Sequence, residues 1–359
     1  MKHSYILAGT ILRKIVRLLF SRGVSLNPGR LLRALFLLQN GIWASLFKSM
    51  ERRRYGHLLV KFPVPDDPVI IIGHWRTGTT FLHQLLNLDP AMAAPTVFQV
   101  SIPDSFLVSK KYYQPIMTAM ISPVRPMDNV KLGIDEPQED EYALYKLTLD
   151  SPLDDLVFQR TNHYFLKHFD NFDPRDKENW QKEFREFCKK LAFHSKKRIV
   201  LKNPFHSMRI PLLRETFPNA RFVHIHRHPY SVVPSTINMW NIVGTQNILK
   251  GKWIKPGIEE VSAFLDRMLD KIRTDLAVLP PETYCEVNYS DLDADPINEL
   301  KKIYKTLGLK YSPEFEQKIR KFLNELGDFK KNVYNLSDDE KDIIRTKLAA
   351  HFYHYKYPR

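Results

Sequence analysis

The stretch Val69-Ile70-Ile71-Ile72-Gly73-His74-Trp75-Arg76-Thr77-Gly78-Thr79-Thr80 decides the fold of this chain. Its first four residues are apolar and β-branched, which is typical of a buried strand in a parallel sheet. Gly73 ends this strand, and the residues after Thr80 have the spacing of a helix. A strand, a glycine-bearing loop and a helix N-terminus together predict an anion-binding cradle, because backbone N–H groups converge there and the helix dipole favours negative charge.

The cradle differs at one residue from the phosphate loop of nucleoside triphosphatases. The pattern G-x-x-x-x-G-K-[ST] fits residues 73–80, except that Thr79 stands where the pattern requires lysine. Triphosphatases use that lysine to neutralise the β and γ phosphates. Here the nearest cation is upstream, at Arg76. We therefore expect the loop to hold a smaller anion, such as one 5′-phosphate that carries a further group; the residues expected to bind it are Arg76, Thr77, Gly78, Thr79 and Thr80.

Strands and helices alternate along the rest of the chain. Short apolar runs predict strands at residues 198–202, 221–226 and 284–288, with helical segments between them and a capped helix opening at Ser337. This alternation predicts an α/β fold with a central parallel sheet flanked by helices, and it places ligands at the carboxyl ends of the strands.

A second anion site is expected where the 221–226 strand ends. Arg227 follows that strand directly, and Ser235 comes eight residues later. Pro229 is well suited to the first turn of a helix, so Ser235 would lie about two turns along it. The guanidinium and the hydroxyl could then grip one phosphate. Together with the first loop, the pair predicts a nucleotide that carries anions at two places.

These motifs resemble those of the sulfotransferases that use 3′-phosphoadenosine 5′-phosphosulfate (PAPS). In that family a loop of the type Arg/Lys-Ser/Thr-Gly-Thr-Thr binds the 5′-phosphosulfate, and an Arg and a Ser eight residues apart bind the 3′-phosphate. Lys202 in the segment 201–204 resembles a family lysine that points at the donor, and Tyr289-Ser290-Asp291-Leu292 resembles a late family element. The similarity runs over residues 68–310.

The resemblance implies a P-loop-like three-layer architecture, PAPS as the sulfonate donor, and a small-molecule hydroxyl as the acceptor. The most similar branch is the bacterial-type one, which is rich in segments such as Arg125-Pro126-Met127-Asp128 and Pro137-Gln138-Glu139-Asp140-Glu141. A sulfuryl group needs less charge neutralisation than a γ-phosphate, so we expect no metal. The alternating residues His224, His226 and His228 are interpreted as supports for the 3′-phosphate loop.

The catalytic candidates follow from the chemistry of sulfuryl transfer. Negative charge grows on the bridging oxygen of the leaving nucleotide, and Lys202 together with Arg76 and the loop amides would stabilise it. An alcohol acceptor benefits from a general base. His206 is one candidate for this base, and Glu139 or Glu141 is the other. A helix over residues 136–149 would place Glu136, Glu139 and Asp140 on one face.

Composition limits the partners and the compartment. The chain has 359 residues, a formal charge of +14 and two cysteines, Cys188 and Cys285. Two cysteines suit a reducing compartment, which favours the cytoplasm. The positive charge favours an anionic partner, but no nucleic-acid recognition motif is present, so we expect no nucleic acid.

The N-terminal region is expected to be separate from the catalytic domain. Residues 1–62 predict an amphipathic helical segment with a break near Asn27-Pro28-Gly29, and residues 63–359 the sulfotransferase domain. The uncharged run 34–47 is too short to span a bilayer. Residues 1–54, basic and apolar, either contact a membrane surface peripherally or pack on the core.

The acceptor is indicated only by aromatic side chains expected to cover the cleft, which are Phe98, Phe106, Tyr112, Tyr113, Trp240 and Trp253. An apolar pocket suits a hydrophobic alcohol such as a sterol or lipid. Two alternatives stay open: a carbohydrate sulfotransferase, since aromatic rings also stack on sugars, and a P-loop-type kinase or nucleotide hydrolase. The missing loop lysine and the pair Arg227 and Ser235 argue against the kinase or hydrolase.

Overall fold

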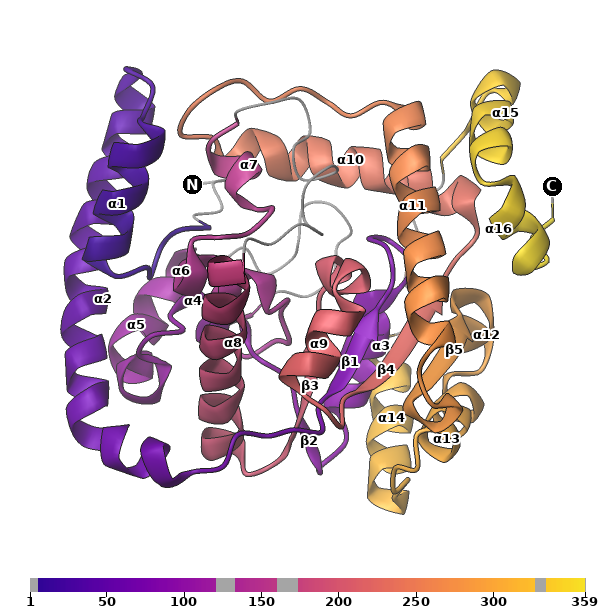
Figure 1. Cartoon of the computed structure of the whole chain (residues 1–359), viewed down its shortest axis with the longest axis horizontal. Helices are drawn as coiled ribbons and strands as arrows, with labels where there is room; N and C mark the ends of the chain where they lie inside the picture. Colours follow the sequence, from indigo (N-terminus) through magenta and orange to yellow (C-terminus); the bar gives the residue numbers. More distant parts are fainter. Residues whose placement is uncertain (1–5, 121–132, 160–173, 327–333, 359) are drawn as a thin grey trace. The chain divides into compact units, whose positions relative to one another are not determined.

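The computed structural model describes residues 6–120, 133–159, 174–326 and 334–358 (Figure 1). The chain forms two compact units. The first unit combines Met1–Pro65, Pro95–Lys196 and Trp240–Lys255, and the second combines Asp66–Ala94, Lys197–Met239 and Pro256–Arg359. The boundary at residue 62 between a helical segment and a catalytic domain stays a prediction.

The second unit is built on a five-stranded parallel sheet with the order β2-β3-β1-β4-β5. Its strands are β1 (Val69–Ile72), β2 (Met92–Ala93), β3 (Arg198–Lys202), β4 (Arg221–His226) and β5 (Tyr284–Asn288). The central strand is β1, in which Ile71 is in register with Lys202 of β3 and Ile72 with His224 of β4. The expected α/β class is confirmed, and the carboxyl ends of the strands meet at one edge of the sheet.

One face of the sheet carries a large apolar core. Its helices are α3 (Thr79–Asn87), α12 (Tyr289–Ala294), α13 (Pro296–Thr306) and α14 (Pro313–Leu326). Leu85, Leu300 and Phe315 of these helices belong to the same buried cluster as Val69, Ile71 and Val200 of the sheet. Side chains alternate between the faces of a strand, so Lys202 points to the same face as Val200. The sequence therefore directs this lysine to the side of α3, at the end of β3.

The other helices of the second unit include η2 (Pro204–Met208), α9 (Ile210–Thr216), α11 (Ile258–Ala277), η3 (Pro281–Thr283), α15 (Asp338–Lys347) and α16 (Ala349–His354). Helix α10 (Pro229–Asn247) begins in this unit, and its residues from Trp240 on are counted with the first unit. In Figure 1, α9 and α11 pass in front of the sheet, while α3 lies behind it, so helices cover both faces. Helix α11 packs against η2, α9 and α15. The expected cap of α15 is confirmed, since the Glu340 backbone N–H donates to Ser337 Oγ at 3.2 Å.

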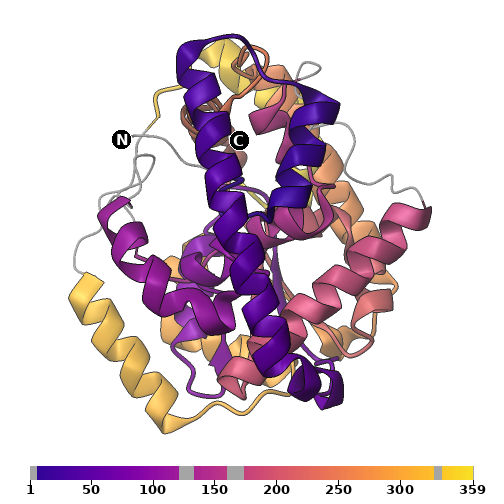
Figure 2. The ribbon, with the colours of Figure 1, turned by 90° about the vertical axis from the view of Figure 1, so that its left-hand side faces the viewer.

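The first unit is helical. Its elements are α1 (Leu12–Arg22), α2 (Pro28–Lys61), α4 (Val97–Ser101), α5 (Phe106–Met120), α6 (Glu141–Thr148), α7 (Asp154–Val157) and α8 (Pro174–Ser195). The break between α1 and α2 is confirmed, with Asn27 capping α2 through the Gly29 N–H. Helices α1 and α2 touch closely at Gly41, where a Cβ would lie 2.9 Å from Leu12 Cα. Figure 2 views these two helices face on.

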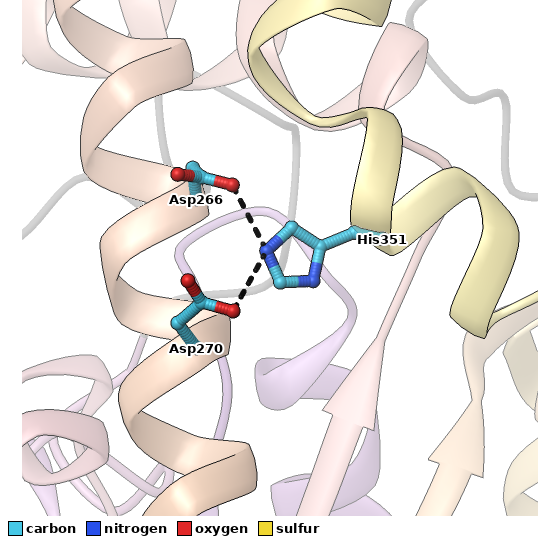
Figure 3. Close-up of side chains that lie close together, drawn as sticks. All are labelled: Asp266, Asp270 and His351. Atoms are coloured by element: carbon cyan, nitrogen blue, oxygen red, sulfur yellow. Dashed lines mark ion pairs between the residues drawn. The ribbon is translucent and has the colours of Figure 1, made fainter.

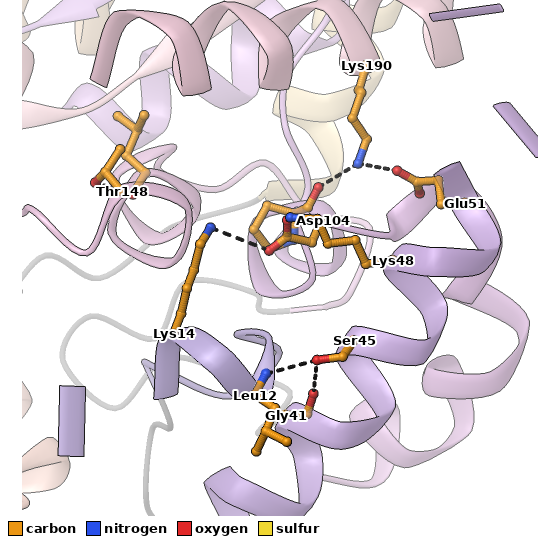
Figure 4. Close-up of polar contacts among 11 residues, drawn as sticks. Leu12, Lys14, Gly41, Ser45, Lys48, Glu51, Asp104, Thr148 and Lys190 are labelled. Atoms are coloured by element: carbon orange, nitrogen blue, oxygen red, sulfur yellow. Dashed lines mark hydrogen bonds and ion pairs between the residues drawn. The ribbon is translucent and has the colours of Figure 1, made fainter. Parts of the chain in front are cut away.

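Ion pairs with buried carboxylates join the elements of the first unit (Figure 4). Lys48 Nζ of α2 lies 2.6 Å from Asp104 Oδ1, and Lys14 Nζ of α1 lies 3.9 Å from Asp104 Oδ2. Glu51 of α2 pairs with Lys190 of α8 and accepts the Leu107 N–H at 2.8 Å. Burial raises the pKa of Glu51, while Lys190 opposes that shift. A buried carboxylate of this kind is stable because its charge is paired and hydrogen-bonded.

Two expectations about residues 95–149 are wrong. Helix α6 begins at Glu141, so Glu136 and Glu139 precede it, and the common helical face of Glu136, Glu139 and Asp140 does not form. Pro137 explains this, because it has no N–H and holds its neighbour in extended backbone. The proline- and aromatic-rich sequence of residues 95–135 predicts short helices and loops, but α5 is a helix of 15 residues.

The segment Arg125-Pro126-Met127-Asp128 lies outside the described residues. Among the helices that are described, none combines the length and apolar character needed to cross a membrane.

Candidate active site

The loop after β1 is fixed by backbone contacts at both of its ends. The Gly73 N–H donates to Ser207 Oγ at 2.8 Å, and the Ser207 hydroxyl lies 3.2 Å from the Gly73 carbonyl oxygen. Thr77 Oγ1 donates to the His74 carbonyl oxygen at 2.7 Å and closes the turn. Gly73 has φ 146°, and a Cβ there would lie 2.3 Å from the Ile225 carbonyl oxygen of β4. Glycine is thus required where the loop crosses the strand end.

Helix α3 begins directly after this loop. Gly78 is its N-cap residue, with a left-handed φ of 98° and no side-chain cap. The first N–H groups of a helix have no partner within the helix, and here no side-chain cap takes them. Thr77 and Thr79 are buried on either side of Gly78, and Thr80 is half-buried. The arrangement suits an anion at the start of α3.

The structure brings Arg76, Arg227 and Ser235 together. Arg76 Nε donates to Ser235 Oγ at 2.9 Å, and Arg227 Nη1 lies 3.5 Å from the Arg76 carbonyl oxygen. Arg76 itself has a left-handed φ of 69°. The sequence motifs predicted that Arg76 binds the 5′-phosphosulfate and that Ser235 binds the 3′-phosphate. Because these two side chains are hydrogen-bonded, the two expected anion sites adjoin each other.

Tyr289 completes this group, although the sequence motifs did not identify it as a site residue. Its ring lies under the Arg227 guanidinium, with Cζ 4.4 Å from the ring centroid. The same ring contacts Gly78, where a Cβ would lie 2.2 Å from Tyr289 Cδ2. Tyr289 directly follows β5, so its place at the carboxyl edge of the sheet is the signal that could have identified it.

The electrostatics of this group favour an anionic ligand. Burial lowers the pKa of Arg227, and the neighbouring cation Arg76 acts in the same direction, while Tyr289 opposes it. Two guanidinium groups that are partly withdrawn from water repel each other, and an anion placed between them relieves that repulsion. With the open helix start nearby, the residues fit a nucleotide that carries two separate anionic groups.

Lys202 is the last residue of β3, and His206 lies in the short helix η2 that follows. Lys202 is buried. Burial lowers the pKa of His83 on α3 to about 3, and the positive charge of Lys202 is the second cause of this shift. Asn203 caps η2, accepting the Phe205 N–H at 3.0 Å, and His206 lies fully buried in that short helix. Because its pKa is lowered in this way, His83 is neutral at pH 7.

Glu139 and Glu141 belong to the first unit, so the four catalytic candidates are divided equally between the two units. Glu141 is fully buried at the start of α6, and its Oε1 accepts the Ser151 hydroxyl at 2.6 Å. Glu139 lies two residues before the first residue of α6 and is half-buried. The assignment of the base stays a prediction.

The three alternating histidines contact the C-terminal segment and β5. His224 Nδ1 lies 3.0 Å from Glu286 Oε1, His226 Nδ1 lies 2.5 Å from the Tyr357 hydroxyl, and His228 Nε2 lies 2.9 Å from the Pro358 carbonyl oxygen. Each imidazole thus has its own partner. These contacts connect β4 and the start of the Arg227 loop to β5 and the C-terminal segment. The role of the histidines as supports for the 3′-phosphate loop stays a prediction.

A different group of side chains has the composition of a metal site (Figure 3). His351 Nε2 of α16 lies 3.1 Å from Asp266 Oδ1 and 3.7 Å from Asp270 Oδ1 of α11. Both aspartates are partly exposed, while His351 is buried. Burial lowers the pKa of His351, while the carboxylates of Asp266 and Asp270 oppose that shift, and these contacts hold α16 against α11.

Comparisons with known proteins show which family the chain resembles. The model of the sulfotransferase family matches residues 68–313. Omega-hydroxy-beta-dihydromenaquinone-9 sulfotransferase Stf3 of Mycobacterium bovis is 32% identical over 325 residues, which are 89% of this chain and 81% of the relative. The protein of the same name from Mycobacterium tuberculosis gives the same figures.

Two solved structures share the fold. Sulfotransferase STF9 from Mycobacterium avium has a TM-score of 0.71 at 18% identity, covering 96% of both chains. Sulfotransferase STF1 from Mycobacterium tuberculosis has a TM-score of 0.62 at 18% identity, covering 94% of this chain and 92% of the other. The family match and the 32% identical sulfotransferase show that the alternative of a kinase or nucleotide hydrolase is wrong. The chain belongs to the sulfotransferase family and is a PAPS-dependent enzyme of its bacterial-type branch.

Proposed function

We propose that this enzyme transfers the sulfonate group of PAPS to a hydroxyl of a hydrophobic lipid. One observation carries the choice of acceptor: over 89% of its length the chain is similar to an enzyme named for a menaquinone-derived lipid. A carbohydrate hydroxyl is the alternative acceptor.

The proposed donor site uses the residues that meet at the carboxyl edge of the sheet. Arg227 and Ser235 would bind the 3′-phosphate. The open start of α3, with Thr77, Gly78, Thr79 and Thr80, would bind the 5′-phosphosulfate. Arg76 would lie between the two, which its hydrogen bond to Ser235 supports. A bidentate guanidinium suits phosphate oxygens better than an ammonium group does.

The reaction breaks the bond between sulfur and the bridging oxygen and forms a bond between sulfur and the acceptor oxygen. Lys202 and the N–H groups of α3 would stabilise the charge that remains on the bridging oxygen. A general base takes the acceptor proton, and the nucleotide leaves as adenosine 3′,5′-bisphosphate. We propose His206 as this base, with Glu139 and Glu141 as the alternatives. No metal is needed, since the transferred group carries little negative charge.

The aromatic side chains expected to cover the acceptor all lie in the first unit. Phe98, Phe106, Tyr113 and Trp240 are buried, whereas Tyr112 is 47% exposed. Most of them therefore stabilise the first unit rather than line an open pocket. The two cysteines are free, which supports the proposal of a cytoplasmic enzyme. Peripheral contact of the N-terminal helices with a membrane belongs to the same proposal.

The decisive experiment incubates the purified protein with PAPS and separate panels of lipid alcohols, sterols, phenols and sugars in detergent. Mass spectrometry then detects an added sulfonate. We expect modification of the lipid alcohols. Modification of sugars alone would overturn the acceptor class, and release of adenosine 3′,5′-bisphosphate shows whether the donor is consumed at all.

The base is tested separately. The variant His206→Ala should bind adenosine 3′,5′-bisphosphate as the wild type does but lose turnover by a factor of about 100 or more. If turnover is unchanged, His206 is not the base, and Glu139→Gln and Glu141→Gln become the variants to compare.

A further inference from the structure

One face of α2 exposes large apolar side chains along most of its length. We call this the outer face of α2; its residues are Leu31 (41% exposed), Leu32 (67%), Leu35 (61%), Ile42 (49%), Trp43 (54%), Leu46 (52%) and Met50 (44%). They recur at the three- and four-residue spacing of one helical face. At 1.5 Å per residue, they cover about 28 Å of the helix. A soluble protein rarely leaves an apolar strip of this length in contact with water.

The opposite face of the same helix is buried. Ala34, Leu37, Gly41 and Ala44 point inward, and Ser45 accepts the Leu12 N–H of α1 at 3.0 Å. On a third side, Phe47 packs against Tyr112 and Tyr113 of α5. Helix α2 is therefore already anchored in the first unit by other side chains. The exposed strip is not needed for that packing.

Charge distinguishes among the surfaces that could cover this strip. Residues 6–61 contain eleven lysines and arginines and one acidic residue, Glu51. Glu51 is buried and paired with Lys190. Arg13 and Arg17 are exposed on α1, and Arg52, Arg53 and Arg54 are exposed next to the end of the strip. A second copy of the chain would bring these arginines, and a net charge of +14, against like charge.

We propose that the outer face of α2 lies in the interface of an anionic membrane. The flanking arginines would contact lipid phosphates, and the leucines, Ile42 and Trp43 would enter the region of the acyl chains. The opposite face of α2 packs within the first unit, so only the outer face would enter the membrane, and the helix would lie in the membrane plane rather than cross it. This inference rests on the proposed function, because an enzyme acting on a membrane lipid must approach its acceptor at that surface.

Vesicle flotation of the full-length protein tests the proposal. We expect the protein to float with vesicles of phosphatidylcholine and phosphatidylglycerol, and to float less with phosphatidylcholine alone or at high salt. The double substitution Leu35→Ser and Leu46→Ser should weaken vesicle binding roughly tenfold or more. Its matched control is Val278→Ser with Tyr353→Ser, since these side chains are 79% and 82% exposed but lie outside α2. The control pair should float as the wild type does.

Two further measurements separate the possible outcomes. Replacing Arg52, Arg53 and Arg54 by serine should remove the preference for anionic vesicles and leave the melting temperature nearly unchanged. Equal flotation of the wild type and the α2 double variant would overturn the proposal. So would a wild-type dimer in solution that the double variant converts to monomer, because the strip would then be a subunit interface.

The activity assay distinguishes this inference from the proposed function. The α2 double variant should sulfonate a lipid alcohol in detergent at the wild-type rate and lose turnover only when the same alcohol is embedded in vesicles. If no lipid alcohol is modified even in detergent, the proposed function fails, whatever the vesicle result. If lipid alcohols are modified in detergent but the protein never floats, the membrane inference alone fails.

Discussion

Replacing Gly78 by alanine tests whether the start of α3 and the Arg227 site depend on one another. Gly78 has φ 98°, and an added Cβ would lie 2.2 Å from Cδ2 of Tyr289, with two more ring atoms within 3.2 Å. The same ring lies under the Arg227 guanidinium, 4.4 Å from Cζ. A methyl group at position 78 therefore pushes directly on the ring that supports Arg227.

The size of the effect follows from these distances. An ordinary contact begins near 3.4 Å, so either the ring or the loop must move by about 1.2 Å. Left-handed backbone costs an alanine about 1–2 kcal/mol in addition. A displacement of about 1 Å at a reacting centre lowers turnover by about two orders of magnitude. We expect Gly78→Ala to lower kcat/KM by about that factor and to weaken adenosine 3′,5′-bisphosphate binding at least tenfold.

The matched control is Gly308→Ala. Gly308 also has positive φ, at 61°, but no atom lies within 4 Å of the position of its Cβ. This variant carries the backbone cost without the collision. Isothermal titration with adenosine 3′,5′-bisphosphate and thermal melting of both variants separate the two effects. If Gly78→Ala binds the nucleotide as tightly as Gly308→Ala does, the coupling through Tyr289 is wrong.

Four further changes test other parts of the site. Arg227→Lys keeps the charge but loses the planar fork, so nucleotide binding measured by titration should weaken roughly tenfold, and an unchanged affinity would remove Arg227 from the phosphate site. Lys202→Met should lower kcat about a hundredfold or more while the Kd of adenosine 3′,5′-bisphosphate stays nearly constant; an equal loss in both would make Lys202 a binding residue. Tyr357→Phe removes the hydroxyl that contacts His226, and the free energy of unfolding in urea should fall by about 1 kcal/mol. The hydrogen bond from His224 lowers the pKa of Glu286 in the folded protein. Ionised Glu286 therefore stabilises the fold at pH values above the ordinary glutamate pKa of about 4.5. This stabilisation is lost as the pH falls through the lower pKa that Glu286 has in the folded protein. Glu286→Gln should therefore flatten the acid side of the stability profile, and an unchanged profile would contradict the pairing.

The parts of the fold that the sequence predicts well are those whose signal is local. The strands at residues 69–72, 198–202, 221–226 and 284–288 have the predicted bounds. Each is a short apolar or β-branched run bounded by turn residues, which few other structures accommodate. Strand β2 was missed, because two residues, Met92 and Ala93, are too few to show a period.

The candidate site was predicted in part, and the limit has a physical cause. The motifs identified Arg76, Arg227 and Ser235 separately, but the hydrogen bond between Arg76 and Ser235 joins residues 159 positions apart. No local pattern reports a contact of that range. Ser207 and Tyr289 were overlooked for the same reason, since their importance lies in what they touch: the Gly73 backbone and the Arg227 guanidinium.

The acidic residues near the start of α6 show how a single proline, Pro137, can make a helical sequence pattern misleading; they are Glu136, Glu139, Asp140 and Glu141. Residues 136–149 have helical spacing, but the Val97 and Gln138 N–H groups pair this segment with residues 95–97 instead, at 2.9 Å and 2.8 Å. The helix begins only at Glu141. Glu141 then lies fully buried, which is the opposite of a solvated acidic face. A carboxylate in that position is stable only with partners such as the Ser151 hydroxyl.

The contact between Arg76 and Ser235 has a consequence for how the donor is recognised. A serine hydroxyl that accepts a hydrogen bond from a guanidinium keeps its own O–H as a donor. A phosphate bound at Ser235 would therefore also be attracted by the positive charge of Arg76. Arg76 belongs to the loop that leads into α3. One hydrogen-bonded set of side chains would then contact both anionic groups of the nucleotide. An anion at either end would order the loop for the other, so a donor that lacks its 3′-phosphate should lose more affinity than one hydroxyl contact supplies.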